Sequence, residues 1–315
     1  MSEARIAFLF PGQGSQFVGM GRDLHEESAE ARKLFDLAGE AAGMDLTELC
    51  FEGPFDALSR TNVLQPAITT VNLACLAWLR ENGMEPWATA GHSLGEYSAL
   101  ACAGVLSPVD AVRVSAARGR CMDDAATRFP GTMYAIIGLP MDKVAAEMER
   151  LVPRSEGGVA NLNAPEQVVV SGTREAMERA SNHFEDLGAH VVELPVSGAW
   201  HSELMAFAEK PFGMVLDEVD FNEPALRLYL NVTGRPAEGV ADIKDALFRQ
   251  LRSPVRWVDI IEGLKNDGVT RFVEVGPGRV LRGMVRRIWP DTSAYKVSSV
   301  SSLASLRRVI EAFKD

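Results

Sequence analysis

The pentapeptide Gly91-His92-Ser93-Leu94-Gly95 constrains the fold of this chain more than any other segment. A short apolar stretch, residues 87–90, comes before it, and a helical pattern, residues 96–103, follows it. This order predicts a strand, a sharp turn and a helix, in which the flanking glycines make room for a serine whose Oγ points outward. The helix directs its dipole and its first N–H groups at the same spot. We therefore predict that Ser93 is a nucleophile; the alternative is a tight turn without a catalytic role.

Apolar runs and their breakers elsewhere predict a parallel sheet covered by helices. Residues 6–10 form a continuous apolar run that ends at Pro-Gly-Gln-Gly, which is typical of a buried strand leading into a glycine-rich turn. Residues 66–80 have helical spacing, with a proline at the start and a glycine just past the end. Ser107 caps another helix. Further strands are expected at residues 226–231 and 271–275.

The pattern changes after residue 128. Strands and helices follow there in the order β-α-β-β-α-β, the split βαβ arrangement of a ferredoxin-like domain. The predicted elements are residues 133–139, 141–152, 158–162, 167–171, 173–187 and 190–194. The fold class is therefore α/β, with a large catalytic domain made of residues 1–128 and 198–315 and a small inserted subdomain made of residues 129–197. A serine-rich stretch, residues 298–305, leads into an amphipathic C-terminal helix.

Composition and charge exclude several classes of protein. The 32 Lys and Arg against 43 Asp and Glu give a net charge of −11, which argues against nucleic-acid binding. The four cysteines lack CxxC spacing, so they indicate neither a disulfide framework nor a zinc site. The first apolar run stops at Pro11, too early for a secretion signal, and the longest uncharged stretch, residues 61–79, contains many polar side chains. We expect a cytoplasmic protein without a membrane segment.

A serine nucleophile needs a base, and His201 is the best candidate among five histidines. His201 follows an apolar strand and a turn of small residues, a placement that brings its ring to the mouth of a cleft between the two domains. The other four histidines are less suitable. His25 and His183 lie in charged helical segments, His92 adjoins the nucleophile with a side chain that should diverge from it, and His190 begins a strand of the subdomain. The alternative for His201 is a structural histidine with its hydrogen bonds satisfied.

The order of serine and histidine disfavours an ordinary esterase or lipase. Those enzymes place an acid between the two and the histidine late in the chain, whereas no histidine follows His201 here. A Ser-His dyad whose imidazole is oriented by a backbone carbonyl still meets the requirement for nucleophile, base and orienting group. The loop at residues 10–16 fails as a nucleotide-binding GxGxxG because Phe17 takes the third glycine position. Its other use is to present the N–H of Gln13 to an oxyanion.

Eight motifs, in order along nearly the whole chain, resemble the malonyl-CoA:acyl carrier protein transacylases. They are FPGQGSQ (10–16), QPA (65–67), GHSLGEY (91–97), RG (118–119), NLNAP (161–165), VSGAWHS (196–202), QL with SPVRW (250–257) and EVGPG (274–278). The resemblance implies an α/β-hydrolase-like core that carries the ferredoxin-like insertion.

The resemblance also implies a role for each matching residue. Ser93, activated by His201, attacks malonyl-CoA, and the malonyl-serine is then attacked by the phosphopantetheine thiol of an acyl carrier protein. The oxyanion donors are the N–H groups of Gln13 and Leu94, and the main chain of Gln250 orients the histidine. The substrate carboxylate is bound by Arg118, since a guanidinium offers it a bidentate match. The remaining pocket residues are Gln65, Asn161, Asn163 and Trp200.

Substrate choice and partners are set less tightly by these motifs. Trp200 stands where many relatives carry Phe, so the tolerance for other acyl groups stays open, as does a fatty-acid or a polyketide pathway. No metal or prosthetic group is implied, and we expect a monomer. An acidic carrier protein could dock on a basic helix, for which a solvated face is the alternative reading. Its arginines are Arg279, Arg282, Arg286 and Arg287, and its apolar face holds Val280, Leu281, Met284, Val285 and Ile288.

Three other functions remain as alternatives at this point. A hydrolase shares the dyad but releases its acyl group to water, so thiol-dependent turnover separates it from a transacylase. A binding module tolerates the loss of Ser93. A nucleotide-binding protein shows saturable affinity for nucleotide.

Overall fold

The first strand, β1 (Arg5–Phe10), lies at the centre of a five-stranded parallel sheet ordered β7-β2-β1-β8-β9. The computed structural model describes residues 4–314. The other four strands are β2 (Ala88–Gly91), β7 (Arg227–Tyr229), β8 (Val269–Val275) and β9 (Lys296–Val300). In this register Phe10 lies opposite Gly91, so the glycine-rich loop after β1 and the serine turn after β2 leave the sheet side by side.

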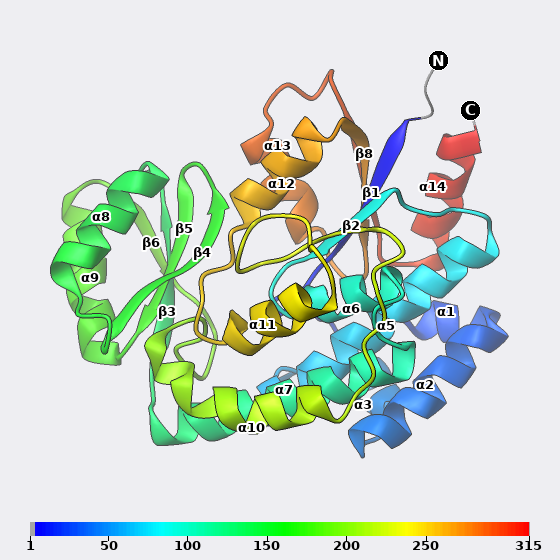
Figure 1. Ribbon diagram of the computed structural model, residues 1–315, viewed down its shortest axis with the longest axis horizontal. Coiled ribbons are helices and arrows are strands. Elements are labelled where there is room, and N and C mark those ends of the chain that lie inside the picture. The colour runs from blue at the N-terminus through cyan, green and yellow to red at the C-terminus, as the bar shows by residue number, and fades with distance from the viewer. Residues whose placement is uncertain (1–3, 315) are drawn as a thin grey trace.

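Helices cover both faces of this sheet (Figure 1). Phe8 and Phe10 point to one face, where the large core includes helices α5 (Thr61–Glu81), α6 (Gly95–Cys102) and α7 (Pro108–Arg128). Ala7 and Leu9 point to the other face, toward α12 (Trp257–Asn266) and α13 (Val280–Ile288). The alternation follows the two-residue period of a strand, and burial on both faces explains the continuous apolar run of β1.

The remaining helices of the large domain flank these layers. They are α1 (Arg22–Glu27), α2 (Ala29–Ala42), α3 (Leu46–Phe51), α4 (Phe55–Leu58), α10 (Ala206–Asp217), α11 (Val240–Gln250), α14 (Leu303–Lys314) and the 3-10 turn Glu203–Met205. Ser107 caps α7 as predicted, since its side chain accepts a hydrogen bond from the N–H of Asp110.

A second, antiparallel sheet stands beside the first (Figure 1). Its order is β4-β5-β3-β6, and its elements are β3 (Thr132–Ile137), α8 (Met141–Leu151), β4 (Gly157–Ala164), β5 (Gln167–Gly172), α9 (Arg174–Asp186) and β6 (His190–Glu193). Ile136 and Val168 face the two helices, while Ala135 and Val169 face the large domain. The predicted fold class, an α/β protein with an inserted βαββαβ unit, is confirmed.

Backbone hydrogen bonds join the inserted unit to the large domain, in addition to the two segments where the chain passes between them. Pro130 and Gly198 form a bridge where the chain leaves and returns. Val255 pairs with the edge strand β4, because its N–H donates to Ala160 O and its carbonyl accepts from the N–H of Leu162, both at 2.9 Å. The boundaries at residues 129 and 197 stay a prediction.

Three local expectations were wrong. Helix α5 begins at Thr61, five residues before Pro66, which lies inside it, because the buried face of α5 continues through that first turn. This helix has the length and hydropathy of a membrane span, contrary to the reading of its composition, although 78% of the stretch is buried inside the protein. The serine-rich stretch does lead into the C-terminal helix α14, as expected, but its first residues also belong to β9, an edge strand without the usual β-branched alternation that the sequence did not predict. Val280 is exposed, so it leaves the apolar face of α13.

Candidate active site

The turn that carries Ser93 is closed so tightly that only glycine fits on either side. A Cβ on Gly91 would lie 1.9 Å from the carbonyl carbon of Gly95, and a Cβ on Gly95 would lie 2.0 Å from the carbonyl oxygen of Phe10. Ser93 itself has a φ of 50°, a conformation that costs a non-glycine residue free energy and is concentrated at functional sites. The turn therefore fixes the Oγ at the end of β2, in front of the N-terminus of α6.

Ser93 and His201 form a hydrogen-bonded pair. The Oγ of Ser93 lies 2.7 Å from Nε2 of His201, and Nδ1 of the same ring lies 3.0 Å from the carbonyl oxygens of both Gln250 and Ser253. Two carbonyl acceptors require a proton on Nδ1, which leaves Nε2 free to accept the proton of the serine. Burial, followed by the nearby charge of Arg118, lowers the pKa of His201 to about 3, so the imidazole is neutral at physiological pH.

A buried cation touches the same Oγ. Arg118 in α7 is 1% exposed, and its Nη2 donates to the Oγ of Ser93 at 3.1 Å. Its Nη1 donates to Gln65 Oε1 at 2.9 Å and its Nε to Gln250 Oε1 at 3.0 Å. Described acidic side chains form no ion pair with Arg118, and burial lowers its pKa. A guanidinium held by neutral groups is prepared to bind a carboxylate at the nucleophile.

Gln250 joins the base to the cation. Its backbone carbonyl holds His201, while its side-chain oxygen accepts from Arg118 and from the hydroxyl of Tyr97. Its side-chain nitrogen donates to Ser93 O and to the carboxylate of Glu96. Burial raises the pKa of Glu96 to about 7. Every polar atom of the Gln250 side chain is therefore engaged, which fixes the relative positions of base and cation.

Asn231, just past β7, ties the serine turn to the rest of the sheet. Its Oδ1 accepts from the N–H of Ser93 and its Nδ2 donates to Gly91 O, both at 2.6 Å. Its backbone N–H donates to Glu96 at 2.9 Å. Sequence reasoning did not select Asn231, Glu96 or Tyr97, although Glu96 and Tyr97 belong to the serine motif and Asn231 ends a predicted strand. An asparagine at the end of a predicted strand was the available signal.

The two backbone donors expected at the oxyanion lie on adjacent loops. A Cβ placed on Gly12 would be 2.6 Å from His92 O and 3.4 Å from the nitrogen of Leu94, so the loop after β1 runs against the serine turn. Within residues 4–314, the N–H groups of Gln13 and Leu94 have no hydrogen-bond acceptor. Two unsatisfied N–H groups beside a nucleophile can receive the negative charge of a tetrahedral intermediate.

The other predicted pocket residues differ in how closely they approach the Ser93 site. Gln65 contacts Arg118 directly, and the Oδ1 of Asn163 lies 2.7 Å from Nε2 of His92. Asn161 lies in β4 and forms a bridge with Val255. Trp200 is buried in the large core, where a Cβ on Gly198 would lie 2.5 Å from its ring. No contact that the structure gives for Trp200 reaches Ser93.

Among the rejected histidines, one expectation was wrong. His25 is half-buried, not solvated, and its ring packs edge-on against Phe35 and Phe51. His183 pairs with Glu147, and His190 is exposed on the edge strand β6.

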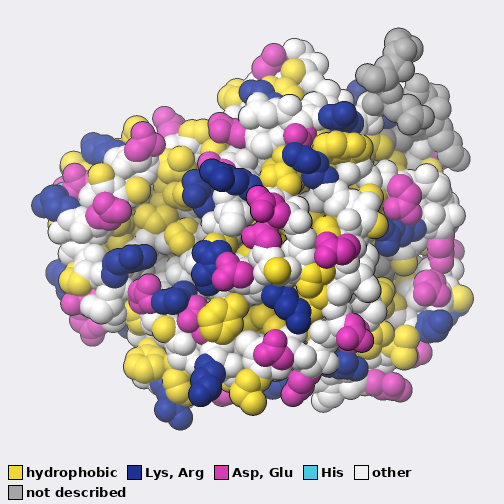
Figure 2. All heavy atoms as spheres, viewed as in Figure 1, with side chains coloured by type: hydrophobic (Ala, Val, Ile, Leu, Met, Phe, Trp, Pro, Cys, Tyr) yellow, Lys and Arg dark blue, Asp and Glu magenta, His cyan; other side chains and the backbone are white. Residues whose placement is uncertain are grey.

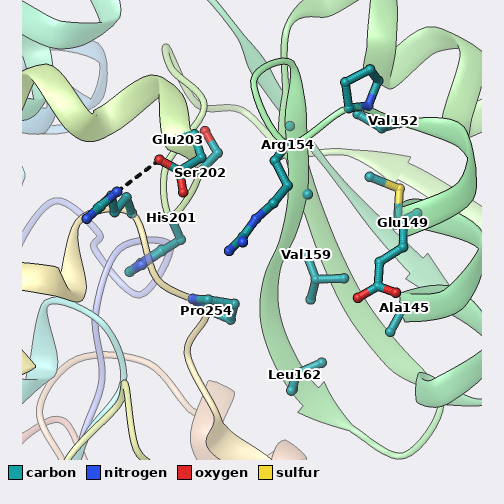
Figure 3. Close-up of a pocket in the computed structure, with 15 residues that line it drawn as sticks. Ala145, Glu149, Val152, Arg154, Val159, Leu162, His201, Ser202, Glu203 and Pro254 are labelled. Atoms are coloured by element: carbon teal, nitrogen blue, oxygen red, sulfur yellow. Dashed lines mark hydrogen bonds and ion pairs between the residues drawn. The ribbon is translucent and has the colours of Figure 1, made fainter.

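Two openings lie beside this group of residues. A cleft of about 570 Å³ separates α8 and β4 from the segment after His201, and His201 lines it (Figure 3). A second pocket of about 520 Å³ is lined by Gln13 and by residues 195–197 of the hinge. Ser93 and Arg118 line neither opening, so the hydrogen-bond geometry, not cavity size, identifies the reacting group. In the described chain, no three His, Cys, Asp or Glu side chains gather in a metal-binding cluster.

The arginines of α13 face in different directions. Arg279 and Arg282 line a pocket of about 440 Å³ with Arg308 and the serines of β9. Arg286 is exposed, and Arg287 reaches across to Gln167 of the inserted subdomain.

Comparisons with known proteins all point to the same enzyme family. The acyl transferase domain family matches residues 7–313. A malonyl CoA-acyl carrier protein transacylase of Bacillus subtilis is 41% identical over 99% of this chain and 98% of its own length. A malonyl-transacylase solved with its type II PKS acyl-carrier protein superposes with a TM-score of 0.93, at 36% identity over 98% of this chain and 100% of that one. An acyl carrier protein S-malonyltransferase of Vibrio cholerae superposes with a TM-score of 0.90, at 39% identity over 97% and 100% of the two chains.

Proposed function

Because this chain belongs to the acyl transferase family, among the malonyl CoA-acyl carrier protein transacylases, we propose that it moves a malonyl group from malonyl-CoA to the phosphopantetheine thiol of an acyl carrier protein. The chain is an acyltransferase, and its product serves fatty-acid or polyketide synthesis. The observation that carries the proposal is the convergence of two groups on one atom. The base His201 and the buried cation Arg118 both lie within hydrogen-bond distance of the Oγ of Ser93.

The first half-reaction acylates the serine. As the Oγ of Ser93 bonds to the thioester carbon, its proton passes to Nε2 of His201, and the carbonyl oxygen becomes an oxyanion that accepts from the N–H groups of Gln13 and Leu94. The carbon–sulfur bond then breaks. The departing CoA sulfur takes the proton from His201, which leaves a malonyl ester on Ser93 and a neutral imidazole.

Arg118 selects the acyl group. A malonyl ester on Ser93 carries its free carboxylate a short distance beyond the ester carbon, and the Nη2 of Arg118 lies 3.1 Å from the Oγ to which that ester is attached. The carboxylate replaces this hydrogen bond with an ion pair inside the protein, where a charged hydrogen bond is strong because little water competes. An acyl group without a carboxylate leaves the buried charge without a partner.

The second half-reaction reverses the first with a different thiol. The thiol of the carrier protein gives its proton to His201 as its sulfur attacks the ester carbon, and the proton returns to the Oγ of Ser93 when the ester breaks. The enzyme contributes no prosthetic group of its own to this scheme. The substrates are malonyl-CoA and the phosphopantetheinylated carrier protein.

The intact mass of the protein after brief incubation with malonyl-CoA tests this function. We expect one malonyl adduct on the wild type, none on Ser93→Ala, and loss of the adduct when a carrier-protein thiol is added. Rapid release of malonate to water, with no thiol present, would identify a hydrolase instead. Retained turnover by Ser93→Ala would contradict the assignment of the nucleophile.

Four finer features belong to the same proposal. The protein acts as a monomer in the cytoplasm, and residues 129–197 form the inserted subdomain. The carrier protein docks near the arginines of α13, three of which are exposed: Arg279, Arg286 and Arg287. Their positive charge on an enzyme of net charge −11 supports docking of an acidic partner. Charge reversal of Arg282 and Arg286 tests this docking, because an unchanged KM for the carrier protein would exclude it.

A further inference from the structure

The cleft of about 570 Å³ joins the catalytic base to the inserted subdomain. One wall consists of α8 and β4, and the other consists of His201 to Glu203 with Arg252 and Pro254 (Figure 3). In the proposed reaction the leaving sulfur takes its proton from His201. The long arm attached to that sulfur therefore leaves the site past His201, and the cleft is the opening that His201 lines.

Four charged side chains line the cleft, and they are not equally neutralised. Arg252 is held by Glu203 at 3.1 Å and by Glu209 at 2.5 Å. Glu149 lies at the far end, beside Ala145 (Figure 3). Arg154 has no hydrogen-bond or ion-pair partner anywhere in residues 4–314. Figure 3 shows its guanidinium extending from the loop before β4 into the cleft, toward the wall of His201 and Pro254.

The rest of the lining suits a flexible arm. Met148, Val159 and Leu162 present apolar surface along the subdomain wall. Gly158 adds no side chain, and a Cβ placed on it would meet no atom within 4 Å, so the strand leaves open space at this point of the cleft wall. An arm with both methylene groups and amides finds apolar contact here without a steric barrier.

The second opening is less suited to an anion. Two carboxylates, Asp56 and Asp123, line it together with one arginine, Arg60. Burial raises the pKa of Asp123, and the nearby charge of Arg60 opposes that rise in part. Arg154 is therefore the arginine in these two openings whose charge no carboxylate offsets.

We propose that Arg154 binds the phosphate of the phosphopantetheine arm that malonyl-CoA and the carrier protein share. The inference rests on the proposed function, which supplies the substrates. The arm phosphate, a diester in the carrier protein and half of a diphosphate in malonyl-CoA, is an anion at physiological pH in both substrates, and a guanidinium binds its free oxygens through two parallel hydrogen bonds. Because the arm is common to both half-reactions, one arginine serves the acyl donor and the acyl acceptor alike.

Steady-state kinetics with three malonyl donors test the proposal. They are malonyl-CoA, malonyl-phosphopantetheine, which has the arm phosphate but no nucleotide, and malonyl-pantetheine, which has neither. For Arg154→Ala we expect KM to rise roughly tenfold or more for the first two donors, with kcat within about twofold of wild type, and no change for malonyl-pantetheine. The KM for the carrier protein should rise equally, and Arg154→Lys should restore part of the loss.

Each other result overturns the inference. An equal loss on all three donors would assign Arg154 a structural role, and a loss on malonyl-CoA alone would assign it to the nucleotide phosphates. Arg150→Ala is the matched control, because Arg150 lies on α8 outside the cleft and pairs with Glu147 at 2.7 Å. A wild type that forms no malonyl-serine would contradict the proposed function itself, and this outcome is read before any variant is compared.

Discussion

Arg118 donates a hydrogen bond from Nη2 to the Oγ of Ser93 at 3.1 Å, so the buried cation touches the nucleophile before any substrate binds. The same charge opposes protonation of His201. The resting site therefore holds a neutral base, a hydrogen-bonded nucleophile and a positive charge that, among the described residues, forms no direct ion pair. We propose that a substrate carboxylate supplies this partner, which would couple selection of the acyl group to the chemistry.

Loss of Arg118 should lower the rate of serine acylation by malonyl-CoA more than the rate with a thioester that has no carboxylate. We expect Arg118→Ala to lower kcat/KM for acylation by malonyl-CoA roughly 30- to 5,000-fold, because truncating one partner of a buried charge pair costs about 2–5 kcal/mol. Acylation by acetyl-CoA should fall much less. Rates of adduct formation, followed by intact mass, measure both. Arg120→Ala on the same helix is the control, since Arg120 is exposed. Equal losses with the two thioesters would contradict a carboxylate-binding role.

The ring of His201 should stay neutral over the usual pH range. Its pKa is lowered from the ordinary 6.5 to about 3, first by burial and then by the charge of Arg118. The NMR signals of this ring, assigned with His201→Ala, should therefore not titrate between pH 8 and pH 5. In Arg118→Gln the repelling charge is gone, so the pKa of His201 should rise. A wild-type midpoint near 6.5 would contradict the lowered pKa itself, and an unchanged or lower pKa in Arg118→Gln would show that the charge of Arg118 does not act on His201.

Asn231 should matter for stability as well as for catalysis. Asn231→Ala leaves the N–H of Ser93 and the carbonyl of Gly91 without their partner, and each unsatisfied buried group costs about 1–3 kcal/mol. We expect the free energy of unfolding to fall by at least about 2 kcal/mol, and serine acylation to slow because the turn loosens. Urea unfolding and intact mass measure the two effects. Asn182→Ala on the exposed face of α9 should change neither, and equal stability of both variants would remove Asn231 from the support of the turn.

Substitution by alanine should change protein stability in opposite directions at two helical glycines. A Cβ on Gly95 would lie 2.0 Å from the carbonyl oxygen of Phe10, whereas a Cβ on Gly283 in α13 would meet no atom within 4 Å. Gly95→Ala should therefore lower stability by more than about 3 kcal/mol or prevent folding, since the obstacle is backbone. Gly283→Ala should raise stability by about 0.5–1 kcal/mol through helix propensity. Thermal unfolding compares the two, and a stable, active Gly95→Ala would show that the loop after β1 does not press against the serine turn.

The sequence alone determined the parts of this protein that depend on local order. Strand periodicity and turn residues predicted the parallel sheet and the inserted βαββαβ unit, and the GxSxG pattern located the serine turn. Elimination among five histidines selected His201 as the candidate base for Ser93, and the family resemblance pointed to Arg118. These signals are readable because each lies within a few residues of chain.

The tertiary structure decided which distant groups meet. Asn231 lies 138 residues after Ser93 and Gln250 lies 132 residues after Arg118, yet each pair is hydrogen-bonded, because parallel strands and their loops gather at one edge of the sheet. The same folding packs His25 against two phenylalanines and leaves Arg154 without an ion-pair partner among residues 4–314. No local pattern encodes such contacts, since burial and charge pairing depend on what the rest of the chain places beside a residue.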